Sequence, residues 1–222
     1  MEKNGKIFIQ IASYRDPELL NTIKDCIEKS DNSQNLVFGL CWQHSKDDKW
    51  DNLDEYLDDP RFKIVDVDFN ESKGACWARN SLQQQYDGEQ YTFQLDSHHR
   101  FIEGWDTELI NMLEGLIEKG HKKPLLTSYI SSYNPENDPE GRVNVPWLMN
   151  FDRFIPEGAV FFLPATIPNW ETLTEPVPAR FYSAHFAFSL GSFVEEVPHD
   201  PEYYFHGEEI SIAVRAYTHG YD

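Results

Sequence analysis

The feature that most limits the possible folds of this chain is an alternation of two kinds of segment over its first 130 residues. Short runs rich in β-branched and aromatic residues predict strands, and the segments between them space their apolar residues three and four apart, as helices do. In the first helical segment, Asp16 and Pro17 suit the helix start, and Gly120 is placed to end the last one. The alternation predicts an α/β fold with a mostly parallel central sheet flanked by helices. The predicted strands are 6–13, 35–42, 62–69, 90–97 and 124–131, and the predicted helices are 15–30, 48–59 (short and acidic), 72–86 and 104–120.

The composition of the sequence changes after residue 131. Residues 131–150 are rich in Pro, Asn and Gly and predict a long surface loop, which Trp147, Phe151 and Phe154 make a substrate-facing segment rather than a disordered one. Residues 158–165 and 179–197 are expected to form strands with a turn between them, and 206–222 a partly apolar helix. Since no repeat or linker interrupts the chain, we expect one domain over 1–222.

Composition narrows the possible partners. The formal net charge of −19 opposes binding to nucleic acid or to an anionic membrane, although local cations and a divalent metal still allow a nucleotide to bind. Cys26, Cys41 and Cys76 lack the spacing of a metal or disulfide site, and Cys26 is expected to be a small buried residue. The N-terminus has no signal-peptide pattern, and no apolar stretch reaches the ~20 residues of a membrane span, so we expect a cytoplasmic protein.

Three polar loops follow predicted strands: "SYRDP" at 13–17, "DFNESKGACWARN" at 68–80 and "DSHHRF" at 96–101. In open α/β sheets, ligands bind beyond the carboxyl ends of the strands, and parallel strands bring these ends to one edge. The sequence therefore predicts a single ligand site lined by all three loops.

The segment "QLDSHHRF" places Asp96 and His98 two residues apart at the end of a strand. A carboxylate and an imidazole there can share a divalent ion such as Mn²⁺, particularly when phosphate oxygens complete the coordination. The alternative is a polar turn with ordinary hydrogen bonds. His99 should point the other way and have a structural role.

Other charged residues in these loops allow two interpretations each. Arg15 and Arg79 can bind a base, ribose or diphosphate, or form salt bridges with acidic side chains. Asp66 and Asp68 flank the end of a strand, where they can bond a ribose hydroxyl or a uracil edge, or face water.

The two predicted helices that open with acidic residues are equally ambiguous. Glu208 and Glu209 can act on a sugar or acceptor, or complement the helix dipole. Asp106 can do the same or serve as a plain N-cap, and Trp105 can stack on a sugar or lie in the core.

In their order along the chain, the segments "IASYRDPELLNTI", "SKGACWARN", "QLDSHHRFIEGWDTELI" and "FHGEEISIAVRAYTHGYD" resemble GlcNAc glycosyltransferases of the cytoplasmic Skp1-hydroxyproline type. These are nucleotide-sugar enzymes of the GT-A class. The resemblance implies a Rossmann-like nucleotide-sugar-binding half (1–130) and an acceptor-side half (131–222). It also implies UDP-GlcNAc as donor, transfer with retention, and a hydroxyl acceptor such as hydroxyproline on a protein, or a glycan.

The resemblance implies roles for particular residues. Asp96 and His98 would hold Mn²⁺ or Mg²⁺; such enzymes commonly have a further metal-binding histidine after the last helix, and the candidates before Asp222 are His185, His206 and His219. The resemblance also matches Ser13, Arg15 and Arg79 to nucleotide and diphosphate contacts, and Glu208 to an element lining the acceptor side. Together with the residue patterns above, catalytic roles are expected for Glu208, Glu209 and Asp106. Donor contacts are expected from Ser13, Arg15, Asp66, Asp68, Gly74, Arg79, Gln94 and Ser97, and acceptor contacts from Trp105, Trp147, His185 and His206.

Two other functions compete with a transferase. A nucleotide-sugar or glycan-binding module of the same fold would bind without turnover. A metal-dependent hydrolase would use Asp96, His98 and His99 and would bind its metal without a nucleotide.

Overall fold

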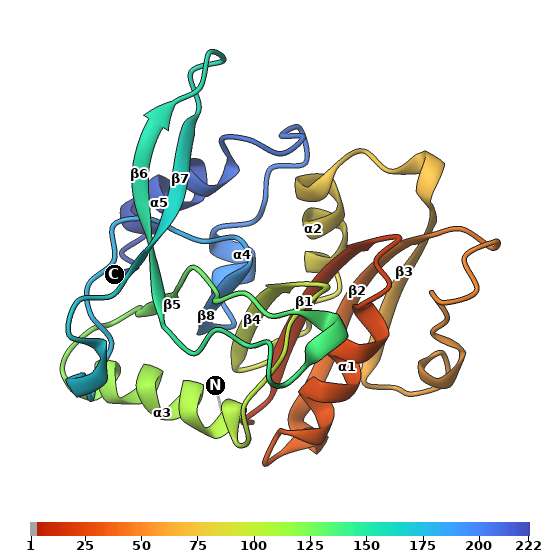
Figure 1. Ribbon diagram of the computed structural model, residues 1–222, viewed down its shortest axis with the longest axis horizontal. Helices are drawn as coiled ribbons and strands as arrows, with labels where there is room; N and C mark the ends of the chain where they lie inside the picture. The colour runs from red at the N-terminus through yellow and green to blue at the C-terminus, as the bar shows by residue number, and fades with distance from the viewer. Residues whose placement is uncertain (1–3) are drawn as a thin grey trace.

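The computed structural model describes residues 4–222, and its centre is a six-stranded sheet in the order β3-β2-β1-β4-β8-β5 (Figure 1). A separate two-stranded hairpin, β6–β7, rises from this body. The strands are β1 (Ile7–Tyr14), β2 (Leu36–His44), β3 (Phe62–Asp68), β4 (Tyr91–Asp96), β5 (Leu125–Thr127), β6 (Trp147–Phe154), β7 (Val160–Thr166) and β8 (Phe186–Leu190). The helices are α1 (Leu19–Glu28), α2 (Ala75–Gln83), α3 (Trp105–Glu118), α4 (Phe193–Glu196) and α5 (Glu208–Thr218).

The sheet is mostly parallel, as the sequence predicts. β1 pairs in parallel with β2 and β4, and β2 pairs in parallel with β3. β8 runs antiparallel to both of its neighbours, β4 and β5. The carboxyl ends of β1, β2, β3 and β4 therefore meet at one edge, which is the edge where the three polar loops emerge.

Alternation along β1 assigns each of its faces to a different helix layer. Ile7, Ile9 and Ile11 belong to the main core cluster with residues of α1 and α3, and Phe8 packs on the opposite face with residues of α2. A third cluster joins α4 and α5 to β8. The sheet is thus covered on both faces, which holds the loops at its carboxyl edge in fixed positions.

The acidic helix expected at 48–59 is absent, and the described chain has a short 3₁₀ turn at Asp54–Tyr56 instead. Two aspartates of this region bond to the ends of neighbouring strands: Asp51 accepts from the Trp42 indole at 2.6 Å, and Asp48 pairs with Arg15. These contacts fix an irregular path, and the closely spaced negative charges repel one another in a helix.

Two expectations for the second half are wrong. The loop expected at 131–150 ends early, because β6 begins at Trp147 and pairs with β7 across a turn that contains Gly158 at φ +85°. Residues 179–197 form one short strand, β8, followed by α4, and β7 and β8 lie in different sheets. The local patterns identified strand segments but carried no information about which strands pair.

Two further predictions, the burial of Cys26 and the lack of a membrane-spanning stretch, can be compared with the structure. The three cysteines are free and buried, as expected for Cys26. Across residues 4–222, no helix combines the length and the apolar character that crossing a bilayer requires.

Candidate functional site

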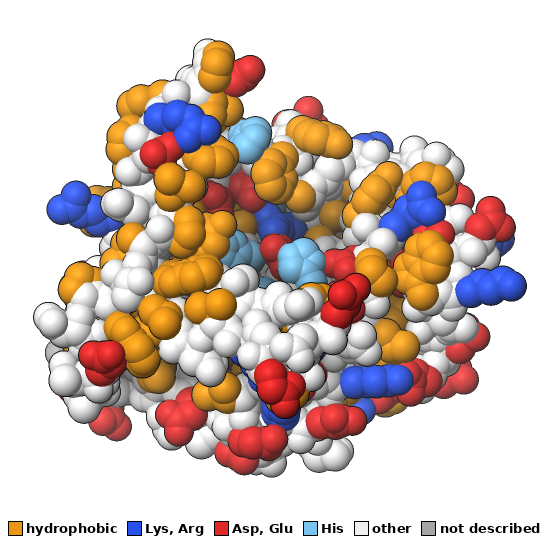
Figure 2. Space-filling view, viewed as in Figure 1, with side chains coloured by type: hydrophobic (Ala, Val, Ile, Leu, Met, Phe, Trp, Pro, Cys, Tyr) orange, Lys and Arg blue, Asp and Glu red, His pale blue; other side chains and the backbone are white. Residues whose placement is uncertain are grey.

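A cavity of about 670 Å³ lies at the carboxyl edge of the sheet. All three polar loops line it. The lining residues are Tyr14 at the end of β1 and Asp16 after it, Phe69, Asn70, Ser72, Gly74, Ala75 and Arg79 after β3, and Asp96, Ser97 and His98 at the end of β4. The opposite wall comes from Ala184, His185 and residues 204–210. Figure 2 shows the hollow with histidine, acidic and basic side chains inside it and hydrophobic side chains around its rim. The size falls in the range of small-molecule sites.

Asp96 and His98 converge inside this cavity. Nε2 of His98 lies 3.9 Å from Oδ2 of Asp96, and both side chains are partly exposed to the cavity. Two metal–ligand bonds of about 2.1 Å each can bridge such a gap. The pair is therefore suited to share one divalent ion with ligands from outside the protein.

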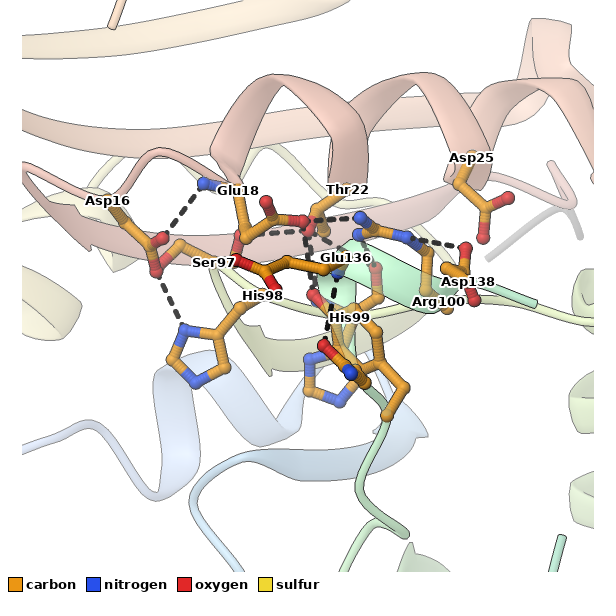
Figure 3. A network of polar contacts seen from close by, with 12 residues as sticks. Asp16, Glu18, Thr22, Asp25, Ser97, His98, His99, Arg100, Glu136 and Asp138 are labelled. Atoms are coloured by element: carbon orange, nitrogen blue, oxygen red, sulfur yellow. Dashed lines mark hydrogen bonds and ion pairs between the residues drawn. The ribbon is translucent and has the colours of Figure 1, made fainter. Parts of the chain in front are cut away.

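Asp16 orients His98 from the loop after β1 (Figure 3). Its Oδ2 lies 2.7 Å from Nδ1 of His98 and 2.6 Å from the hydroxyl of Ser97, and its Oδ1 accepts from the backbone N–H of Glu18. Burial opposes ionisation of Asp16, but these bonds outweigh it and lower its pKa to about 2. The same contact raises the pKa of His98 against the effect of burial. A carboxylate on one ring nitrogen leaves the other free to bind a metal, a common arrangement in metal sites.

His99 is buried, with Nδ1 near the carbonyl of Asp96. Burial lowers the pKa of His99 to about 4, so the ring is neutral at physiological pH. It does not line the cavity.

Arg79, on α2, connects Asp96 to the start of α5. Its guanidinium donates to Oδ1 of Asp96 at 3.0 Å and to Oε1 of Glu208 at 2.8 Å. Burial disfavours its charged form, but the two carboxylates more than compensate and raise the pKa of Arg79. The other carboxylate oxygen of Glu208 accepts from the Cys76 thiol. Of the two interpretations for this arginine, the salt bridge is the one that the structure shows.

Glu209 and His185 lie on the far wall of the cavity. Oε1 of Glu209 accepts from the backbone N–H of Ala184 at 2.9 Å, and burial, only partly offset by this bond, raises the pKa of Glu209 to about 7. Burial lowers the pKa of His185, and its Nε2 accepts from the backbone N–H of Ile130. Glu209 is thus a carboxyl group that can exchange a proton near neutral pH inside the cavity.

Gly74 precedes α2 with φ +106°, a conformation that disfavours other residues. A Cβ at this position would lie 2.6 Å from the carbonyl oxygen of Tyr204, which also accepts from the N–H of Ala75. The loop before α5 therefore packs directly on the N-terminus of α2.

Several residues expected to bind the donor do not line the cavity. Arg15 makes two bonds to Asp48, with its guanidinium over the ring of Phe69 at 4.5 Å. Asp66 contacts His44, and Asp68 accepts from Asn70. Two others are buried in the sheet: Ser13, whose hydroxyl has no partner within the described chain, and Gln94, which bonds Ala184 and His199.

Trp105, Asp106 and Trp147 also lie outside the cavity. Trp105 is in the main core and donates to the carbonyl of Cys26 at 2.9 Å. Asp106 is buried and accepts from the loop after α1, including the N–H of Asp31 at 2.8 Å. Trp147 begins β6, and its ring lies 6.3 Å from that of Tyr129 at an interplanar angle of 55°. The expected residues that do line the cavity are Gly74, Arg79, Asp96, Ser97, His98, His185, His206, Glu208 and Glu209.

The structure adds residues that the sequence did not single out for the site. The sequence pattern predicts Asp16 as a helix start and not as a site residue, and Tyr204 and Phe205 lie just before α5. Arg100, within "DSHHRF", bonds Glu18 and Asp138 and so ties residues 135–142 to this segment (Figure 3).

The metal-binding potential of the chain rests on two side chains. Within residues 4–222, no group of three or more His, Cys, Asp or Glu side chains is arranged to hold a metal. An ion held by Asp96 and His98 thus needs outside ligands, and diphosphate oxygens suit Mn²⁺ and Mg²⁺.

Comparisons with known proteins identify the family and the fold. A sequence model of the family "Glycosyltransferase (GlcNAc)" matches residues 6–59 and 52–222. Among curated proteins there is no match. GalNAc-T7, solved with UDP, GalNAc and Mn²⁺, superposes with a TM-score of 0.66 at 19% identity over 95% of this chain and 40% of its own.

Residues 1–349 of S. aureus TarS form a second similar structure. It gives a TM-score of 0.56 at 12% identity over 96% of this chain and 55% of its own. Its complex with UDP-GlcNAc gives 0.53 at 13% identity, over 96% and 53%. The present chain thus spans about half the length of these proteins, and the likeness establishes the fold. With the family match extending over nearly all of the sequence, the chain belongs to the glycosyltransferase (GlcNAc) family and has a GT-A fold.

Proposed function

We propose that this protein is a metal-dependent transferase that moves GlcNAc from UDP-GlcNAc, with retention, to a hydroxyl group. The observation that carries the proposal is the convergence of Asp96 and His98 in a cavity at the carboxyl edge of a GT-A sheet. The acceptor we propose is hydroxyproline on a protein, as in the Skp1-hydroxyproline type, with a glycan as the alternative. The complex of TarS with UDP-GlcNAc and that of GalNAc-T7 with UDP and Mn²⁺ support the donor and metal.

Asp96 and His98 would hold Mn²⁺ or Mg²⁺. When bound, this ion supplies positive charge that stabilises the leaving diphosphate. Asp16 keeps the His98 ring in its orientation, and Arg79 does the same for Asp96. Tyr14 and Phe69 line the side of the cavity nearest the ends of β1 and β3, where they offer rings to a base.

Glu209 is the residue best placed for proton transfer on the opposite wall. Its pKa of about 7 lets it accept a proton from an acceptor hydroxyl or donate a hydrogen bond to the sugar. Glu208 has both carboxylate oxygens engaged by Arg79 and Cys76, so its role is to position the neighbouring residues.

The proposal includes the organisation inferred from the sequence. Residues 1–130 would form the donor-binding half and 131–222 the acceptor-side half of one domain. The cytoplasm is the proposed location, with neither nucleic acid nor a membrane as partner.

A donor screen tests the proposal. UDP-, GDP- and CMP-sugars are incubated with the protein with and without Mn²⁺, and nucleotide release is measured. We expect Mn²⁺-dependent release of UDP from UDP-GlcNAc, abolished by Asp96→Ala. Binding of UDP-GlcNAc by calorimetry without turnover would instead identify a binding module, and full activity of Asp96→Ala would refute the metal site.

The UDP-release assay, repeated over a range of Mn²⁺ concentrations, gives the Mn²⁺ affinity and so tests the role of Asp16. Asp16→Asn should weaken Mn²⁺ affinity by about tenfold, because residues that orient a metal-binding histidine have effects of that order. Asp222→Asn is a matched control, since Asp222 lies 2.6 Å from Nδ1 of His121 in an exposed pair outside the cavity. Equal effects of the two variants would contradict the assignment.

A further inference from the structure

Cys76 occupies an unusual position for a buried cysteine in this chain. It lies at the start of α2, is fully buried, and donates its thiol to Oε2 of Glu208 on α5. Burial raises the pKa of the Cys76 thiol, with the charge of Glu208 adding to the effect, so the group keeps its proton and remains a donor. Cys41, equally buried in β2, has burial as the one cause of its raised pKa.

The bond from Cys76 is the first of three that end at the metal pair. Glu208 uses Oε2 for the thiol and Oε1 for Arg79. Arg79 in turn donates to Oδ1 of Asp96, while Oδ2 of Asp96 faces His98. One carboxylate oxygen of Asp96 is thereby committed to the protein, and the other is directed at the proposed ion.

The exposed fractions of Arg79, Glu208 and Asp96 indicate which side chain depends on a hydrogen bond to keep its orientation. The side chains of Arg79 and Glu208 are 7% and 6% exposed, whereas that of Asp96 is 33% exposed and free to rotate unless it is held. Without a donor on Oε2, the carboxylate of Glu208 can turn about its last bond and take Arg79 with it. Asp96 would then lose the contact that fixes its orientation.

We propose that Cys76 is a positioning residue for the metal-binding carboxylate of Asp96, acting through Glu208 and Arg79. The inference rests on the proposed function only in taking Asp96 and His98 as the metal pair. The thiol never contacts the metal or the substrate. Its contribution is to hold Glu208 so that Arg79 keeps Asp96 ready for a cation.

The test is a direct measurement of Mn²⁺ binding to the full chain by electron paramagnetic resonance of the free ion. UDP is present to supply the diphosphate oxygens, and a protein-free UDP sample is the blank. Cys76→Ala should weaken Mn²⁺ affinity by about fivefold, because a hydrogen bond to a charged group is lost. Cys76→Ser, which keeps a donor, should stay within about twofold of the wild type. Cys41→Ala is the matched control for loss of a buried thiol and should leave Mn²⁺ affinity unchanged.

Repeating the measurement in a second variant, Glu208→Gln, distinguishes a positioning role of Cys76 from a general loss of structure. In Glu208→Gln, adding Cys76→Ala should change Mn²⁺ affinity no further, since the thiol acts through the carboxylate. Cys76→Val fills similar space without a donor and replaces the alanine variant if that one does not fold. Equal affinities for Cys76→Ala and Cys41→Ala, failure of serine to rescue, or an undiminished effect in Glu208→Gln would each overturn the proposal.

The outcome for the wild type distinguishes the two proposals. Wild-type protein that binds Mn²⁺ but neither binds nor cleaves UDP-GlcNAc would refute the proposed function and leave the role of Cys76 to be decided by its own variants. Wild-type protein that binds no Mn²⁺ would overturn the role of Cys76 itself.

Discussion

Arg79→Met should remove more stability than any other single charge deletion around the cavity. The Arg79–Glu208 pair is almost fully buried, with exposures of 7% and 6%, and breaking such a pair leaves an uncompensated charge that costs about 3–5 kcal/mol. The pair with Asp96, which is 33% exposed, adds at most about 1 kcal/mol. Against a typical total of about 5–15 kcal/mol, the loss is readily measured by urea denaturation.

A double-mutant cycle tests the reasoning behind this magnitude. Arg79→Met combined with Glu208→Gln should be about 1–2 kcal/mol more stable than Arg79→Met alone, because the unpaired buried carboxylate is gone. Arg153→Met, which removes an arginine whose side chain is 58% exposed, should change the free energy of unfolding by no more than about 0.5 kcal/mol. Additive losses in the double variant, or an Arg79→Met value as small as that of Arg153→Met, would refute the argument.

Two further predictions concern Gly74 and Glu209. In urea denaturation, Gly74→Ala should lower the free energy of unfolding by about 2 kcal/mol more than Gly88→Ala. Both glycines have positive φ, but a new Cβ meets the Tyr204 backbone at Gly74 and nothing within 4 Å at Gly88. Equal losses would contradict the close approach. The pKa of Glu209 is near its ordinary 4.5 in the unfolded chain and about 7 in the folded one. The free energy of unfolding of the wild type should therefore fall by at most about 3 kcal/mol as pH rises from 5 to 8, and Glu209→Gln should lack this component. Identical pH dependence of the two proteins would show that the pKa is not raised.

The sequence predicted the architecture well because its signals are local. β-Branched runs and helical spacing predicted the strands and helices of the first half, apart from the acidic segment at 48–59. Once the sheet was expected to be parallel, the rule for carboxyl ends placed three loops at one edge, and the structure puts the cavity there. The pairing of β6 with β7 and the place of β8 depend on long-range packing, which no local pattern encodes.

The partners of individual side chains could not be read in the same way. Asp16 and His98 are 82 residues apart, and Arg79 and Glu208 are 129 apart. Each of the two arginines had a ligand and a salt bridge as its alternatives, and both form salt bridges because acidic groups lie within reach in the folded chain. Trp105 and Asp106 follow the same logic, since Trp105 is buried in the main core and Asp106 accepts from the loop after α1.

The order of strands has a consequence for how the chain folds. β8 pairs with both β4 and β5, and Phe188 stands opposite Phe93 on one side and Leu126 on the other. During synthesis, β4 and β5 emerge long before the strand that joins them, so the edge of β4 remains unpaired until residue 186 is available. Closing this gap brings together segments about 60 to 100 residues apart, which slows folding relative to the more local pairing of β1 and β2. A nascent chain in this interval has an open strand edge, which makes it prone to aggregation and a natural substrate for chaperones.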